Sequence, residues 1–230
     1  RDALCADAIN PTVISSPPSA VAVYGLGGIG KSTLAAALAH DCQVRRHYKD
    51  GVLWVEVGQT PTVISLQAAV GVMLGDDHAN YENPTLANQS LSRMLAQKDA
   101  LILLDDVWDH KIVDHFPISG TACRLLITTR SGTLAGRVDG ADIRLDVLSA
   151  EEGTRLMAEI TGTDAPEFAT ITERLGGHTL AVSLAAKQIL EGYADDAADM
   201  LRLIDKRKDG PQPFKDLTLE DEDKDFNLAL

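Results

Sequence analysis

Residues 25–32 read Gly-Leu-Gly-Gly-Ile-Gly-Lys-Ser, which fits the phosphate-binding pattern G-x-x-x-x-G-K-[ST]. A loop of this pattern directs its backbone N–H groups at a di- or triphosphate. Lys31 would reach the β- and γ-phosphates, the Ser32 hydroxyl would ligate Mg²⁺, and Thr33 could donate to the α-phosphate. We therefore predict a nucleotide site whose backbone donors come from Gly27, Gly28, Ile29, Gly30, Lys31 and Ser32.

The segments on either side of this loop are predicted to form the strand and the helix that a phosphate-binding loop connects. Residues 21–24, Val-Ala-Val-Tyr, are typical of a short buried strand, and residues 33–39 are strong helix formers. The glycines are therefore predicted to lie in a strand-to-helix turn, where the positive end of the helix faces the phosphates.

A second motif overlaps the first. Gly25, Gly27 and Gly30 also fit G-x-G-x-x-G, the dinucleotide-binding fingerprint. Glu56 ends the next strand-like segment, about where the ribose-binding acid of such a site belongs. The lysine and the two hydroxyls at the start of the helix favour a triphosphate, because a dinucleotide turn gains nothing from them.

Two carboxylates follow a continuous apolar run at residues 101–104. Ligands of α/β proteins gather at the carboxyl ends of the parallel strands. We expect Asp105 to hold Mg²⁺ together with Ser32, through a water, and Asp106 to orient or activate the attacking water. The alternative is that the two acids only keep a strand end soluble.

The next apolar run, at residues 125–127, ends in Thr-Thr-Arg. An arginine at such a strand end can reach a γ-phosphate and report whether it is present. Arg130 is therefore predicted to sense the terminal phosphate, and the alternative is a surface arginine paired with an acid.

Strand and helix signals alternate along the first part of the chain, which is typical of a parallel sheet with covering helices. We predict an α/β fold with a five-stranded parallel sheet of the P-loop NTPase type and helices on both faces, over residues 21–147. Ser149 and Glu152 form a capping box, and only helices follow, so residues 148–208 are predicted to be a small all-helical lobe. Residues 1–20 are expected to be a linker, and residues 209–230 an acidic linker.

Composition narrows the class of partner. The chain has 230 residues with 21 Lys and Arg against 34 Asp and Glu, and its net charge is −13. This balance argues against unspecific binding to nucleic acid or to an anionic membrane. The three cysteines are widely spaced and no apolar run reaches the length of a membrane span, so we expect a cytoplasmic protein. Trp54 and Trp108 are expected to pack in a core or an interface.

Five segments in this order resemble a known family. The chain is similar to the NB-ARC module of STAND-class P-loop ATPases, which apoptosome-type scaffolds, plant resistance proteins and many bacterial regulators share. The sequence of residues 50–55 looks most similar to that of bacterial members. The matching segments are residues 25–33, 101–108, 125–130, 148–153 and 175–181.

The resemblance implies binding of ADP or ATP with Mg²⁺ and slow hydrolysis of ATP. It implies that the strand of Arg130 lies between the strand of the loop and the strand of Asp105. It also implies a switch in which ADP holds the lobes closed and ATP permits opening and self-association, with no direct contact to nucleic acid or membrane. A winged-helix lobe follows in the family, and we expect this chain to stop as that lobe begins.

Further residue roles rest on the same resemblance. Arg1 is similar to an arginine that lies near the base, and Thr179 stands where the family usually has a proline against the nucleotide, with Leu180 next to it. Two other functions stay open. One is a turnover P-loop ATPase or kinase, and the other is a scaffold that binds nucleotide for stability without switching.

Overall fold

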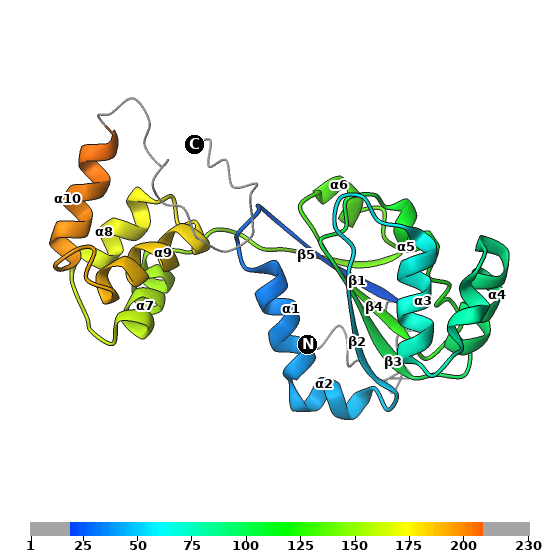
Figure 1. Cartoon of the computed structure of the whole chain (residues 1–230). Coiled ribbons are helices and arrows are strands. Elements are labelled where there is room, and N and C mark those ends of the chain that lie inside the picture. Colours follow the sequence, from blue (N-terminus) through cyan, green and yellow to red (C-terminus); the bar gives the residue numbers. More distant parts are fainter. Residues whose placement is uncertain (1–18, 209–230) are drawn as a thin grey trace, which may run out of the picture. The chain divides into compact units, whose positions relative to one another are not determined.

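The computed structural model describes residues 19–208, which divide into two compact units between Asp146 and Val147. Each unit is described by itself (Figure 1). Arg1, nearly all of the predicted N-terminal linker and the predicted acidic linker at 209–230 lie outside the described residues.

The first unit is built on a five-stranded sheet, as predicted (Figure 1). Its strands are all parallel and stand in the order β2-β3-β4-β1-β5. β4 therefore lies between β1 and β3, as the family resemblance implied, and β5 is a mostly exposed edge strand. The strands are β1 (Ala20–Tyr24), β2 (Gly51–Glu56), β3 (Ala100–Asp105), β4 (Arg124–Thr129) and β5 (Gly140–Arg144).

Helices cover both faces of this sheet because successive side chains of each buried strand point to opposite faces. Val21 and Leu103 pack with Val44 and the other apolar side chains of α1 and α2. Ala22 and Ile102 pack on the opposite face with α3, α4, α5 and α6. The helices of this unit are α1 (Lys31–His40), α2 (Cys42–His47), α3 (Val63–Met73), the 3-10 turn η1 (His78–Tyr81), α4 (Pro84–Leu95), α5 (Lys111–Asp114) and α6 (Gly132–Ala135).

The centre of the sheet supplies much of the apolar burial. All six residues of β3 are buried, and the four leucine and isoleucine side chains at 101–104 are fully enclosed. Enclosing each such side chain is worth about 2 kcal/mol relative to leaving it in water. This rigid strand ends at Asp105, so the sheet fixes the position of the predicted metal-binding carboxylate.

The second unit contains helices only among its described residues. They are α7 (Ala150–Thr161), α8 (Glu167–Arg174), α9 (Thr179–Leu190) and α10 (Ala197–Lys208), packed around Met157, Phe168, Ile171 and Val182. The Ser149 hydroxyl accepts from the Glu152 N–H at 3.2 Å and the Glu152 carboxylate accepts from the Ser149 N–H at 2.9 Å, which confirms the capping box. No helix described in either unit is both long and apolar enough to span a membrane.

Candidate functional site

The glycine-rich loop connects β1 to α1 and depends on glycine at particular points. Gly28 and Gly30 have φ angles of 68° and 102°, where a side chain is strained. A Cβ at Gly25 would lie 2.6 Å from the carbonyl oxygen of Leu145. Gly30 is the N-cap of α1 and offers no capping side chain, so the first N–H groups of this helix are available to an anion.

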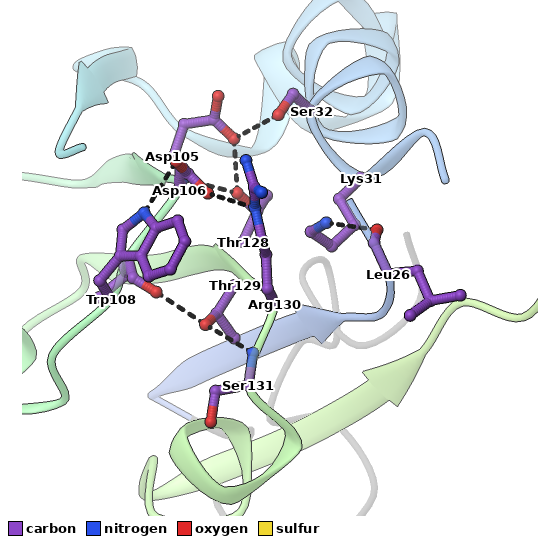
Figure 2. Close-up of polar contacts among 11 residues, drawn as sticks. Leu26, Lys31, Ser32, Asp105, Asp106, Trp108, Thr128, Thr129, Arg130 and Ser131 are labelled. Carbon is purple, nitrogen blue, oxygen red and sulfur yellow. Dashed lines mark hydrogen bonds and ion pairs between the residues drawn. The ribbon is translucent and has the colours of Figure 1, made fainter. Parts of the chain in front are cut away.

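Lys31 is the first residue of α1 and is buried beside the loop. Its Nζ donates a hydrogen bond to the carbonyl oxygen of Leu26 at 2.9 Å (Figure 2). Burial, and then the positive charge of Arg130, hold the pKa of Lys31 below its usual value, while Asp106 and Asp105 act in the opposite direction. Asp106 and Asp105 compensate the burial of this ammonium group only in part. A phosphate in the loop would supply further negative charge beside it.

Ser32 and Asp105 are brought together although they are 73 residues apart in the sequence. The Ser32 hydroxyl donates to Asp105 Oδ1 at 2.8 Å, and the buried Thr128 hydroxyl donates to the same oxygen (Figure 2). Leu104 pairs with Ile127 on the neighbouring strand, so Asp105 and Thr128 come next along β3 and β4. The sheet register thus holds the carboxylate between a helix hydroxyl and a strand hydroxyl.

This pair of oxygens fits the donor set of Mg²⁺. The Ser32 hydroxyl can ligate the ion directly, and Asp105, which accepts from that hydroxyl at 2.8 Å, is close enough to hold the ion through a bound water. Mg²⁺ keeps several waters and needs only one or two carboxylates, and phosphate oxygens take further positions in nucleotide sites.

Asp106 occupies an uncommon backbone conformation. Its φ angle is 54°, and within the described range it is the one residue other than glycine with a positive φ. Its N–H donates to the Thr128 hydroxyl at 2.9 Å, which holds the turn in place. Aspartate tolerates this left-handed region better than most residues, and such strain gathers at functional sites.

Arg130 and Trp108 complete the site next to Asp106. Arg130 Nε lies 3.5 Å from Asp106 Oδ1, the Trp108 indole N–H donates to Asp106 Oδ2 at 2.9 Å, and the Arg130 guanidinium carbon lies 5.0 Å from the centre of the Trp108 ring (Figure 2). Arg130 Nη1 would lie 3.2 Å from a Cβ at Gly27, so the guanidinium is next to the loop. The side chain of Arg130 is 44% exposed and can therefore meet a ligand.

The turn that carries Arg130 is fixed from the opposite side. The buried Thr129 hydroxyl donates to the carbonyl oxygen of Val107 at 2.7 Å and accepts from the N–H of Ser131 at 3.2 Å (Figure 2). The backbone next to Arg130 is therefore anchored, and its partly exposed side chain extends toward Asp106 and Trp108.

The dinucleotide alternative does not fit the sheet order. A dinucleotide-binding fold places its second strand beside the first, which brings the acid at the end of that strand to the ribose. Here the neighbours of β1 are β4 and β5, and β2, which ends at Glu56, lies beyond both β4 and β3. Glu56 is thus three strands away from the strand that enters the loop.

Sequence reasoning identified most of these residues but not the roles of Thr128 and Trp108. The sequence signal that could have pointed to Thr128 is its position just after an apolar run and shortly before Arg130. Trp54 and Trp108 are 38% and 43% exposed, so the expectation of core packing is wrong for both, and the interface alternative stays a prediction. Thr179 and Leu180 begin α9 in the second unit, and Arg1 lies outside the described residues.

The fold and these contacts together define a P-loop nucleotide-binding domain. Its loop, the hydroxyl–carboxylate pair and the strand-end arginine all lie at the carboxyl edge of one parallel sheet. The NB-ARC domain model matches residues 6–165, and the chain belongs to the NB-ARC family. NB-ARC domains bind ADP and ATP.

Similar proteins agree with this assignment. The disease resistance protein RFL1 of Arabidopsis thaliana is 29% identical over 58% of this chain and 16% of its own length. The apoptotic protease-activating factor 1 of Danio rerio is 28% identical over 83% of this chain and 16% of its own length. A STAND protein with a tetratricopeptide repeat sensor from Pyrococcus horikoshii has a similar fold, with a TM-score of 0.56 at 22% identity over 76% of this chain and 28% of that one. The match thus spans 16% of the length of each of the first two relatives.

Proposed function

We propose that this chain is the ADP/ATP switch module of a signalling or regulatory protein, with slow Mg²⁺-dependent hydrolysis of ATP. The observation that carries the proposal is the Arg130 guanidinium beside Gly27, paired with a carboxylate at the end of β3. An arginine in that position distinguishes a triphosphate from a diphosphate, because only the longer ligand brings charge within its reach. The names of the resistance and apoptotic relatives support a signalling role.

Each residue of the site has one role in this proposal. The loop N–H groups and Lys31 neutralise the β- and γ-phosphates, which relieves the unfavourable burial of the ammonium group. Ser32 and Asp105 hold Mg²⁺, which would supply charge neutralisation between the two terminal phosphates. Asp106 orients the attacking water, and Arg130 senses the γ-phosphate.

The second unit is proposed to take part through the start of α9. Gly177 has a φ of 67°, and a Cβ there would lie 2.2 Å from the carbonyl oxygen of Leu148, so this turn requires glycine. The His178 side chain then caps α9 by accepting from the Ala181 N–H. These contacts support a fixed start of the helix for Thr179 and Leu180, which we expect to contact the nucleotide.

The finer parts of the proposal concern the whole protein. We expect exchange of ADP for ATP to open the lobes and permit self-association, in the cytoplasm and without contact to nucleic acid or membrane by this module. The similarity of residues 50–55 to bacterial members stays a prediction about origin.

Arg130→Ala tests the switch directly. We expect the affinity for Mg²⁺·ADP to stay within about twofold and the affinity for Mg²⁺ with the non-hydrolysable analogue adenylyl imidodiphosphate to fall roughly tenfold, because one charge-assisted contact is lost. Isothermal titration calorimetry measures both.

Arg174→Ala is the matched control. Arg174 lies 3.5 Å from Asp205, and its side chain is 46% exposed, so its ion pair is equivalent to that of Arg130 in length and exposure. Arg174→Ala should change neither the affinity for Mg²⁺·ADP nor the affinity for the triphosphate analogue. Equal weakening of both ligands by Arg130→Ala contradicts the sensor role. Continuous steady-state hydrolysis of ATP, with rapid release of ADP after each turnover, would favour a turnover ATPase instead.

A further inference from the structure

Trp108 is the large aromatic side chain of the site, and the roles above leave it without a function. Its ring is 43% exposed, so burial in the core does not explain its position. Two specific contacts do: the indole N–H donates to Asp106 Oδ2 at 2.9 Å, and the ring face lies 5.0 Å from the Arg130 guanidinium carbon. A tryptophan face is the strongest cation–π partner among the aromatic side chains.

The three side chains form a closed ring of contacts (Figure 2). Trp108 holds one carboxylate oxygen of Asp106, and Arg130 Nε faces the other at 3.5 Å. The Nε edge of the guanidinium is thus occupied by Asp106 and one face is occupied by the indole. Nη1 remains directed at the loop, 3.2 Å from where a Cβ at Gly27 would stand.

This arrangement restricts a side chain that is otherwise free to take many rotamers. Ordering a long, half-exposed arginine on ligand binding costs conformational entropy, and a side chain already held in place avoids that cost. An arginine that is already ordered next to the loop binds a terminal phosphate more tightly than one that becomes ordered only when the ligand binds.

We propose that Trp108 is a positioning residue that holds Arg130 beside Gly27, so that discrimination between ATP and ADP depends on the indole ring. The inference rests on the proposed function, because it assigns Trp108 to the same sensor. A purely structural tryptophan would have another signature: its loss would lower stability and would weaken both nucleotides equally.

The test compares Trp108→Leu and Trp108→Phe with the unmodified chain. The ratio of the affinities for adenylyl imidodiphosphate and ADP, both with Mg²⁺, is measured by calorimetry. Trp108→Leu should lower this ratio about fivefold through the affinity for the triphosphate analogue alone. Trp108→Phe, which keeps a ring face without the N–H, should restore most of the ratio. Trp54→Phe is the matched control, since Trp54 is 38% exposed on β2, and it should leave the ratio unchanged.

Trp108→Leu in the Arg130→Ala background separates the two hypotheses. If the tryptophan acts through the arginine, it should change the ratio no further once the arginine is gone. A full additional effect in that background, or a normal ratio in Trp108→Leu alone, overturns the positioning role while the sensor role of Arg130 stands. If Arg130→Ala itself leaves the ratio unchanged, the proposed function fails and the inference fails with it.

Discussion

The corner between α3 and α4 and the carboxyl edge of the sheet contain the same three kinds of side chain in two different settings. At the corner, Asp76 accepts from the Tyr81 hydroxyl at 2.9 Å and lies 3.8 Å from Arg93. At the sheet edge, Asp106 accepts from the Trp108 indole at 2.9 Å and lies 3.5 Å from Arg130. Each region therefore combines an aspartate, an aromatic donor and an arginine.

The two regions differ in how many hydrogen bonds the carboxylate accepts. Asp76 is 7% exposed and also accepts from the Ser90 hydroxyl, the Asn80 amide and the Asp77 N–H. Burial acts to raise the pKa of Asp76, but the hydrogen bonds from Ser90, Tyr81 and Asn80 outweigh it and lower the pKa.

Asp106 stands in the opposite condition. It is 32% exposed, sits on a strained backbone at a φ of 54°, and pairs with a 44% exposed arginine. A carboxylate with every acceptor site filled joins elements of the fold, whereas a partly exposed carboxylate beside a partly exposed arginine is accessible to a ligand. The predictions below apply matched changes to the two regions.

Asp105→Asn should have the largest effect. The amide oxygen can still accept from Ser32 and Thr128, so stability should change little, but the charge proposed to hold Mg²⁺ is lost. We expect single-turnover hydrolysis of ATP to fall by roughly 100-fold or more. Unchanged hydrolysis with Mg²⁺ still required would contradict the role of Asp105.

The same substitution at Asp76 should do the reverse. Asp76→Asn would place an amide N–H₂ against groups that donate, so at least one of them loses its acceptor. We expect the free energy of unfolding in urea to fall by about 2 kcal/mol, while the folded protein binds ADP as before. Asp205→Asn, in a half-exposed pair with Arg174, is the control for a charge loss that should cost little stability. A reduced affinity for ADP in Asp76→Asn would break the comparison.

Alkaline pH should lower the stability that the Asp76 corner contributes. Burial, and then the hydrogen bond to Asp76, raise the pKa of Tyr81 to about 12, above its usual value of 10. The stability that depends on the neutral phenol is present below pH 10 and is lost as the pH rises from 10 to 12, by about 2–3 kcal/mol. Tyr81→Phe should remove this part of the pH dependence in urea titrations.

Nucleotide affinity should also fall at alkaline pH, through Lys31. Burial holds the pKa of Lys31 below 10.5, and a phosphate needs the charged ammonium group, so the affinity for ADP should begin to fall as the pH passes that lowered pKa. An ADP affinity that stays constant in calorimetry as the pH rises through this range would contradict the need for a charged Lys31.

Much of this architecture could be predicted because its signals are local. The loop, the two apolar runs and the capping box each specify an element within a few residues, and all four elements are present as expected. Asn83 accepts from the Leu86 N–H at 3.0 Å and Pro84 begins α4, so this helix also starts at a local signal. The strand order rested on the family resemblance, since periodicity does not specify which parallel strands are neighbours.

The contacts of Trp108 and Thr128 could not be predicted in the same way. Trp108 reaches the carboxylate because Asp106 turns the chain with a positive φ, and nothing in the residue types indicates that turn. Thr128 meets Asp105 because of the register between β3 and β4. The Asp76 cluster joins two helices and a 3-10 turn, so its donors come together only after these elements have packed.

The central claim is that the loop at residues 25–30 and Lys31 bind the phosphates of an adenine nucleotide. Calorimetric titration of Mg²⁺·ADP and of NAD into the unmodified chain, Lys31→Ala and the control Lys98→Ala tests it most directly. We expect one ADP per chain, an affinity reduced roughly 100-fold in Lys31→Ala with thermal unfolding preserved, and no change in Lys98→Ala. An ADP affinity that is the same with and without Lys31, or tighter binding of NAD than of ADP, would contradict it.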